Sequence, residues 1–263
     1  MRVHIGCSGF SYLDWKGVFY PGNLERGEFI TYYSKYFDVV ELNFSFYSFP
    51  RKSVIKSLLS KAKNLKFSTK AHRSFTHYRN YTEESAKRFL ESIGPLLEED
   101  RLIALLFQFP ESFHYNQENL DYIKKLSKDF KDTEKVIEVR SKSFKRASFY
   151  EFLEEIGFSL ANTDAPKEGK FLVGPWRPYG NVNYVRLHGR DPERLYDYLY
   201  SLDELKELKD KIKKLSNKDT YIFFNNTARA QAVYNALQMK LLFGIKVQIP
   251  KTLEERIEGR VWE

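Results

Sequence analysis

The sequence predicts an α/β fold, a single TIM-type (β/α)8 barrel with long loops after its strands. Eight short apolar runs alternate with helix-length segments, which is the order of βα units around a parallel sheet. The runs are nearly continuous in apolar residues, as expected for strands that are covered on both faces. A chain of 263 residues also fits eight units, because such barrels usually need roughly 250 residues. We therefore expect one domain over residues 1–263.

The expected strands are rich in Val, Ile, Leu and Phe, which favour buried strands. They lie at residues 3–6, 39–43, 65–70, 102–109, 136–140, 158–162, 182–188 and 220–224. An open doubly wound sheet is the alternative arrangement. It is disfavoured because no G-x-G-x-x-G follows the first run.

The segments between these runs predict the helices. They lie at residues 26–36, 52–62, 83–93, 118–129, 148–156 and 228–243. Thr82 is suited to cap the helix that follows it. After the seventh run, Asp191 and Pro192 predict a further helix as its N-cap and first-turn proline. The crossover after the sixth run contains three prolines and is expected to be irregular.

The composition indicates a folded protein outside the membrane. Hydrophobic residues make up 42% and aromatic residues 16% of the chain, which excludes disorder. Cys7 is the single cysteine, so an internal disulfide is ruled out and a reducing cytosol is favoured. No apolar run reaches the ~18–20 residues of a membrane helix, and the N-terminus enters a strand rather than a signal peptide. We expect a cytoplasmic protein.

The charge favours anionic partners. There are 43 Lys and Arg residues against 35 Asp and Glu residues, a net charge of +8. Such a balance favours a phosphate-containing ligand, DNA or RNA among them. A Lys- and Glu-rich solvated surface, as in thermostable proteins, explains the same numbers and stays open.

Polar residues gather where the expected strands end, which is where barrel enzymes place their chemistry. They are Ser8, Glu41, Asn43, Lys70, His72, Gln108, Glu138, Arg140, Asp164, Arg186, His188, Asn225 and Asn226. Residues two apart on a strand share one face. We therefore predict one pocket that brings together Glu41, Lys70, His72, Glu138, Arg140, Arg186 and His188. Salt-bridged layers that close the barrel are the alternative, and Arg140 is expected to pair with Glu41 or Glu138.

These residues divide into expected roles. Glu41, His72, Glu138 and His188 are the acid/base candidates, and the other strand-end residues are expected to bind substrate. The long loops add Trp15, Tyr20 and Tyr47, whose rings can stack on bases or sugars, or else build small loop cores. Arg190 and Asn226 follow the seventh and eighth strands, where barrels commonly bind phosphate. We expect both near a phosphate, with Trp15 or Tyr20 near a base.

Three functions remain open. The first is an enzyme that acts on a nucleotide or nucleic acid, such as a phosphodiester-directed hydrolase. The second is a nucleic-acid-binding protein without catalysis. The third is a glycoside hydrolase that uses Glu41 and Glu138 as its carboxyl pair. No cofactor is predicted. A divalent metal beside Glu138 and His188 stays open, although the neighbouring arginines oppose a cation.

Motifs along the whole chain resemble the YecE-like family, also called domain of unknown function 72. They are residues 5–15 (IGCSGFSYLDW), 19–21 (FYP), 41–43 (ELN), 46–47 (FY), 70–73 (KAHR), 76–77 (TH), 106–110 (LFQFP), 138–140 (EVR), 184–190 (YVRLHGR) and 224–226 (FNN). The resemblance implies a TIM-type barrel and no particular reaction. The chain departs from the family at residues 141–144 (SKSF), which replace the usual His-x-Ser-Trp. The family has been likened to barrel endonucleases that act at damaged DNA, an analogy of fold alone.

Overall fold

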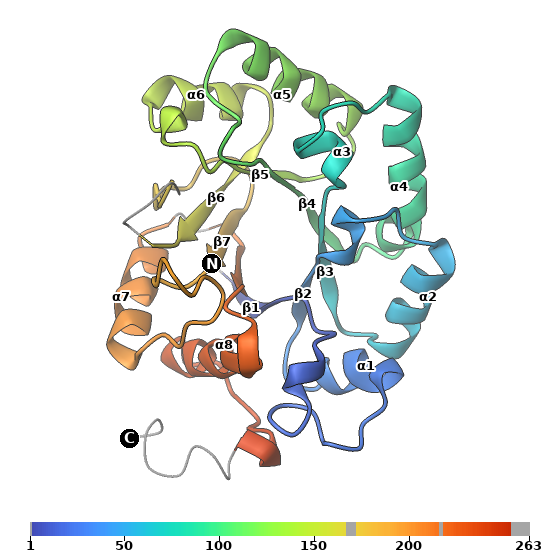
Figure 1. Cartoon of the computed structure of the whole chain (residues 1–263), viewed down its shortest axis with the longest axis vertical. Helices are drawn as coiled ribbons and strands as arrows, with labels where there is room; N and C mark the ends of the chain where they lie inside the picture. The colour runs from blue at the N-terminus through green and yellow to red at the C-terminus, as the bar shows by residue number, and fades with distance from the viewer. Residues whose placement is uncertain (1, 167–171, 216–217, 254–263) are drawn as a thin grey trace.

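A computed structural model describes residues 2–166, 172–215 and 218–253. Eight parallel strands form a closed barrel in sequence order, and β1 pairs with both β2 and β8 (Figure 1). The strands are β1 (Val3–Ser8), β2 (Val39–Leu42), β3 (Lys66–Lys70), β4 (Leu102–Gln108), β5 (Lys135–Glu138), β6 (Ser159–Asp164), β7 (Asn183–Leu187) and β8 (Thr220–Phe224). The predicted (β/α)8 barrel is confirmed.

Helices surround the barrel, as Figure 1 shows. They are α1 (Phe29–Tyr33), α2 (Lys52–Lys61), α3 (Arg73–Thr76), α4 (Glu83–Glu98), α5 (Gln117–Asp129), α6 (Ala147–Glu155), α7 (Leu202–Lys213) and α8 (Gln231–Leu242). Thr82 caps α4 as expected, because its side chain accepts from the backbone N–H of Ser85. Within the described ranges, no helix is long and apolar enough to cross a membrane.

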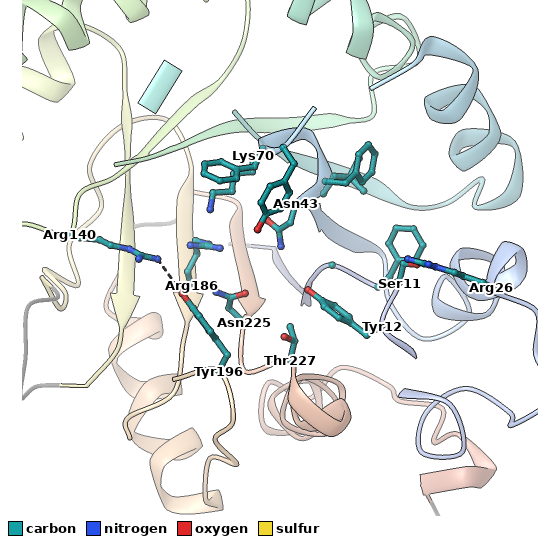
Figure 2. Close-up of a pocket in the computed structure, with 16 residues that line it drawn as sticks. Ser11, Tyr12, Arg26, Asn43, Lys70, Arg140, Arg186, Tyr196, Asn225 and Thr227 are labelled. Carbon is teal, nitrogen blue, oxygen red and sulfur yellow. Dashed lines mark hydrogen bonds between the residues drawn. The ribbon is translucent and has the colours of Figure 1, made fainter. Parts of the chain in front are cut away.

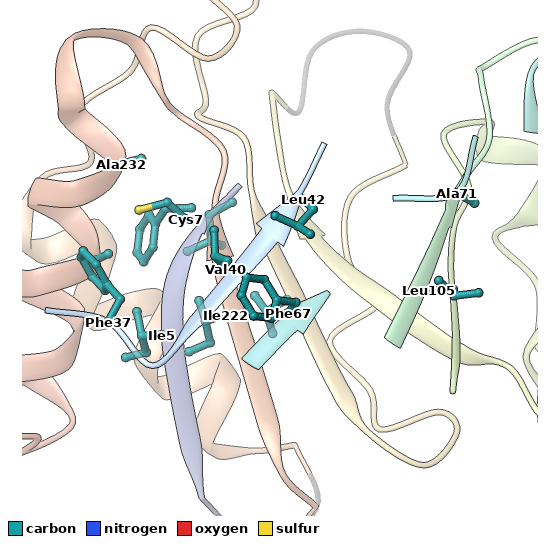
Figure 3. Packing of buried hydrophobic residues seen from close by; sticks show 14 of the residues in the cluster. Ile5, Cys7, Phe37, Val40, Leu42, Phe67, Ala71, Leu105, Ile222 and Ala232 are labelled. Atoms are coloured by element: carbon teal, nitrogen blue, oxygen red, sulfur yellow. The ribbon is translucent and has the colours of Figure 1, made fainter. Parts of the chain in front are cut away.

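The strands present two different faces. Outward-facing side chains such as Ile5, Val40 and Ile222 pack between the strands and the helices in the larger core (Figure 3). Inward-facing side chains such as Val39, Tyr184 and Phe223 fill the barrel itself. The barrel is therefore packed at its centre, and the inward-facing polar residues lie at the carboxyl ends of the strands.

The predicted helix at Asp191 is wrong. The Asp191 carboxylate does accept from the backbone N–H groups of Glu193 and Arg194, but it caps only a turn. The chain then turns back, and α7 begins at Leu202 after its own N-cap, Ser201. The reason lies in the intervening loop, which contributes the buried Tyr200 to the core instead of continuing as a helix.

The last predicted helix starts later than expected. Residues 228–230 form a short 3-10 turn, and Arg229 and Ala230 have φ angles of 53° and 62°. This left-handed backbone is incompatible with a continuous helix, so α8 begins at Gln231. The turn leaves the loop after β8 facing the same end of the barrel as the loop after β1, whose Asp14 accepts from the Arg229 backbone N–H.

Candidate functional site

A buried ionic network lies at the carboxyl end of the barrel. Arg186 on β7 donates from Nε and Nη2 to both carboxylate oxygens of Glu41 on β2, at 3.0 and 2.8 Å. Its Nη1 donates to Glu138 on β5 at 2.5 Å. The side chains of Glu41, Glu138 and Arg186 are 0%, 2% and 2% exposed. One guanidinium therefore joins carboxylates from two strands that are not neighbours in the barrel. We call Glu41, Glu138 and Arg186 the ionic floor.

Tyr184 supports the ionic floor from below. Its hydroxyl donates to Glu41 Oε2 at 2.8 Å and lies 2.7 Å from the Ser68 hydroxyl. Burial and the nearby Glu41 carboxylate raise the pKa of Tyr184 well above its usual value. The phenol therefore keeps its proton and donates it in a hydrogen bond to Glu41 Oε2, which also accepts from Arg186.

Charges inside the network control its protonation. Burial alone would raise the pKa of Glu138, but Arg186 and His188 hold it well below its usual range. Burial lowers the pKa of His188, whose Nε2 lies 3.7 Å from Glu138. The other ring nitrogen lies 2.9 Å from the Asn225 amide. At neutral pH, Glu138 is therefore ionised and His188 is neutral.

A cavity of about 480 Å³ opens above the ionic floor (Figure 2). Its basic lining residues are Arg26, Lys70, Arg140 and Arg186, and no described Asp or Glu lines it. Its aromatic lining residues are Phe10, Tyr12, Phe44, Phe46, Tyr47 and Tyr196, and its polar ones include Ser11, Asn43, Asn225 and Thr227. The two carboxylates lie beneath this lining, so a ligand in the cavity meets cations and rings.

Lys70 is placed differently from the arginines. Its ammonium lies 4.3 Å from the centroid of the Phe46 ring, and it makes no hydrogen bond or ion pair with any described side chain or carbonyl. Burial, and to a smaller extent the nearby Arg186, lower the pKa of Lys70 to about 8, against the opposing effect of Glu138 and Glu41. Lys70 therefore changes charge much closer to neutral pH than an ordinary lysine does.

The structure brings together most of the residues predicted to converge. Glu41, Lys70, Glu138, Arg140, Arg186 and His188 meet at one end of the barrel. Arg140 pairs with Glu138 at 3.6 Å, which confirms the predicted ion pair, and donates to the Tyr196 hydroxyl at 3.3 Å. Asn43, Tyr47 and Asn225 line the cavity. The buried Ser8 lies beside Glu41 in the sheet register.

The predicted aromatic contacts of the first loop are corrected by the structure. Trp15 is fully buried, and its indole donates to the backbone carbonyl of Thr227 at 2.7 Å. Tyr20 is also buried, stacks on Phe29 at 4.1 Å and donates to the carbonyl of Phe10. Both rings build a core for their loop, because a long loop needs apolar packing of its own. Neither is open to a base.

The predicted phosphate contacts after β7 and β8 are corrected as well. Arg190 is held by Asp164 through two hydrogen bonds of 2.8 and 3.0 Å, and by Glu207 at 2.9 Å. Asn226 is buried, and its amide donates to the carbonyl of Tyr198 and to Asn235. These contacts fasten the loops after β7 and β8 to β6, α7 and α8. Neither residue lines the cavity.

Two other predicted residues also lie outside the cavity. His72 packs edge-on against Phe49, and its Nδ1 accepts from the Ser74 backbone N–H at the start of α3. This contact removes His72 from the acid/base candidates that the sequence placed in the pocket. Gln108 is buried and donates to the carbonyl of Phe109.

Sequence reasoning missed several cavity residues. Tyr196, in the loop after β7, and Arg26, in a 3-10 turn before α1, line the cavity, and no pattern in the sequence indicates this. Tyr12, Phe44 and Phe46 belong to aromatic loops that the sequence did indicate, without showing which rings face inward. Among the described residues, no group of three or more His, Cys, Asp or Glu is arranged to hold a metal ion.

Replacing Arg190 with Ala is expected to destabilise the fold without weakening ligand binding. It would leave the buried Asp164 with Tyr200 as its remaining hydrogen-bond donor. The loss of its guanidinium partner is expected to cost about 1–3 kcal/mol in the free energy of unfolding. Urea unfolding and ligand titration on the same preparation test this. Weakened binding at unchanged stability would show that Arg190 contacts the ligand after all.

Comparisons with known proteins agree with this architecture. The family described as "Protein of unknown function DUF72" matches residues 4–258. The UPF0759 protein YunF of Bacillus subtilis is 28% identical over 272 residues, which cover 93% of this chain and 95% of YunF.

Two solved structures are similar over almost their whole length. A DUF72 family protein of Thermotoga maritima is 36% identical with a TM-score of 0.85, covering 93% of this chain and all of that one. A DUF72 family protein of Enterococcus faecalis is 26% identical with a TM-score of 0.80, covering 93% of this chain and 98% of that one. The match to the family over nearly the whole chain, together with these structures, shows that the protein belongs to the DUF72 family.

Proposed function

We propose that the chain is an enzyme that acts on a phosphate-containing ligand, a nucleotide or nucleic acid, in the cavity above the ionic floor. The observation that carries the proposal is the lining, in which Lys70, Arg140 and Arg186 meet aromatic rings and no described carboxylate. Cationic groups neutralise phosphates, and aromatic faces stack on bases. The cavity volume of about 480 Å³ also lies in the range of small-molecule sites.

Lys70 supports catalysis in addition to binding. A group whose pKa lies near the working pH can both give and accept a proton, and the pKa of Lys70 is lowered to about 8. When water attacks phosphorus and the bond to the leaving oxygen breaks, the Lys70 ammonium can donate a proton to that oxygen, and the proton that the water releases returns to Lys70 through solvent. The predicted acid/base candidates Glu41, Glu138 and His188 take positioning roles in this proposal. Glu41 and Glu138 hold Arg186 and Arg140 from beneath the lining, and His188 lies against Glu138.

The arrangement does not favour a glycoside hydrolase. Such an enzyme needs two carboxyl groups that face the substrate across a cleft. Here Glu41 and Glu138 are both engaged by the same guanidinium, and neither lines the cavity. A neutral sugar would also leave the half-buried Lys70 ammonium, which pairs with no described carboxylate, without a counterion.

A binding and turnover panel tests the proposed function. Labelled single- and double-stranded oligonucleotides, mononucleotides and a neutral oligosaccharide are titrated at several salt concentrations, and the mixtures are then examined for products. We expect the phosphate ligands to bind with an affinity that falls with salt, and the oligosaccharide not to bind. Products should form with the wild type and with Lys56→Met, an exposed control on α2, but not with Lys70→Met.

One result would contradict the proposed catalysis, and another would contradict the proposed phosphate ligand. Phosphate ligands that bind without any turnover would show a binding protein rather than an enzyme. Binding of the oligosaccharide alone, even at low salt, would reject the phosphate ligand and restore the glycoside hydrolase.

A further inference from the structure

We infer that the cavity takes its ligand end-on, with a terminal phosphate monoester against Lys70, Arg140 and Arg186 and the attached sugar or base toward Tyr12 and Tyr47. This inference rests on the proposed function and narrows its ligand. If it holds, Lys70, Arg140 and Arg186 do not bind a phosphodiester in the interior of a nucleic-acid strand.

The cations gather at one end of the cavity. Figure 2 shows Lys70, Arg140 and Arg186 on one side, and Ser11, Tyr12 and Arg26 on the other. Electrostatics agree, because Arg186 and Arg140 both lower the pKa of Lys70. Glu41 and Glu138 pair with Arg186 and Arg140 beneath the cavity, so these four groups balance and Lys70 leaves one net positive charge at this end. Arg26 at the other end is exposed and screened by solvent, whereas Lys70 is half-buried, so the stronger pull on an anion is at the Lys70 end.

The same end is the deep one. Arg186 is 2% exposed and lies on the ionic floor, whereas Tyr47 is 66% exposed at the rim. Beneath Arg186, the carboxylates of Glu41 and Glu138 close the barrel. A phosphate that reaches Arg186 is therefore at the bottom of the cavity, and the rest of its molecule must leave toward the rim.

The volume of the cavity favours a terminal phosphate over an internal one. An internal phosphodiester continues on both sides, so both flanking nucleosides would have to pass through the same cavity. Its volume of about 480 Å³ lies at the small end of the range for ligand pockets, roughly 300–1,000 Å³. A phosphate monoester carries one organic group only, and that group can lie along the aromatic rings that line the cavity.

Lys70 provides a donor that is free for this phosphate. It has no hydrogen bond or ion pair with another described residue, although it lines the cavity beside Phe46. A half-buried ammonium without a hydrogen-bonded partner is costly, and a phosphate dianion would satisfy it. Asn43 Oδ1 is likewise buried without a described hydrogen-bond partner, so it can accept from a hydroxyl of the attached sugar.

The pH dependence follows from two ionisations. A phosphate monoester gains its second charge near pH ~6, and a diester has no second ionisation. Free Lys70 has a pKa of about 8 and binds an anion only when protonated. Affinity should therefore rise to about pH 6, stay level, and fall above about pH 8. The ionisable groups that face Lys70 are Glu41 on β2, His77 after α3, Glu138 and Arg140 at the end of β5, and Arg186 on β7.

Calorimetric titration with matched probes tests the inference. The probes are uridine and adenosine 5′-monophosphate, the methyl diester of each, the two nucleosides, and ribose 5-phosphate. Each monophosphate should bind at least about tenfold more tightly than its methyl diester, the effect of one charge-assisted hydrogen bond. Ribose 5-phosphate should share this preference for the monoester, since the phosphate carries it. The nucleosides should bind weakest.

Substitutions at Lys70 show whether the preference arises where we place it. Lys70→Met should reduce the difference between monophosphate and methyl diester, and Lys56→Met should leave it unchanged. Lys70→Arg keeps the charge at every pH tested, so it should bind the monophosphate and lose the fall in affinity above about pH 8. Melting curves establish that each variant is folded. If Lys70→Met does not fold, the pH dependence of Lys70→Arg still tests the role of Lys70.

The outcomes separate this inference from the proposed function. Equal affinity for a monophosphate and its methyl diester would overturn end-on binding and leave a phosphate ligand in place. Binding of oligonucleotides with no binding of any monophosphate would also overturn end-on binding alone, whereas no binding of any phosphate probe, oligonucleotides included, would overturn the proposed function itself.

Discussion

Replacing Arg186 with Met is expected to lower the free energy of unfolding by about 3–5 kcal/mol, because it leaves buried carboxylates without their cation. Glu41 and Glu138 are almost fully buried, and each is bonded to this guanidinium at 3.0 Å or less. Chemical unfolding at pH 7 measures the loss. The matched control is Arg140→Met, whose side chain is 22% exposed and which pairs with Glu138 at 3.6 Å. It should cost far less.

A triple variant tests the reason for the loss. Combining Arg186→Met with Glu41→Gln and Glu138→Gln removes the buried charges together, so it should recover part of the stability that the single variant loses. An unchanged unfolding midpoint for Arg186→Met would contradict the account of the ionic floor. So would a triple variant that is less stable than the single one.

Replacing Arg140 with Glu is expected to weaken binding of a phosphate ligand by about 100-fold. The change removes a charge-assisted contact and puts a negative charge into the cavity, effects of about 1.5–3 kcal/mol or more. Arg140→Gln, which only removes the charge, should lie between this variant and the wild type. Salt titration of nucleotide affinity measures all three.

The control for net charge is Arg88→Glu. Arg88 is exposed on α4, outside the cavity lining, and its reversal changes the total charge by the same amount. Its effect on affinity should be small and should vanish as salt rises, because distant charges are screened. Equal losses for Arg140→Glu and Arg88→Glu would mean that only overall charge matters and that the cavity does not hold the phosphate.

The barrel was predictable because the order of apolar runs records the order of strands. The same period of two residues placed Glu41, Glu138 and Arg186 on inward faces, so their meeting could be foreseen. The sequence also suggested that carboxylates and arginines would pair. It did not show that Arg186, rather than Arg140, would be the arginine that both carboxylates share, because that depends on strand register around the barrel.

The loops were much less predictable. Tryptophans often stack on bases, but Trp15 is buried in the core of its own loop. Arginines often bind phosphates, but Arg190 is bonded to Asp164 and Glu207. Conversely, Tyr196 reaches the cavity because its loop turns back at left-handed backbone, with a φ angle of 71° at Tyr196. Loop conformation depends on contacts between distant segments, and local sequence patterns do not contain them.

The most direct test is a crystal structure of the complex with a nucleoside 5′-monophosphate. We expect phosphate oxygens within hydrogen-bond distance of Lys70 Nζ and of the Arg140 and Arg186 guanidinium groups, with the sugar and base toward Tyr12 and Tyr47. The bonds from Arg186 to Glu41 and Glu138 should remain. A nucleotide bound elsewhere on the molecule, or bound in the cavity with its phosphate turned toward Arg26 and the rim, would contradict this expectation.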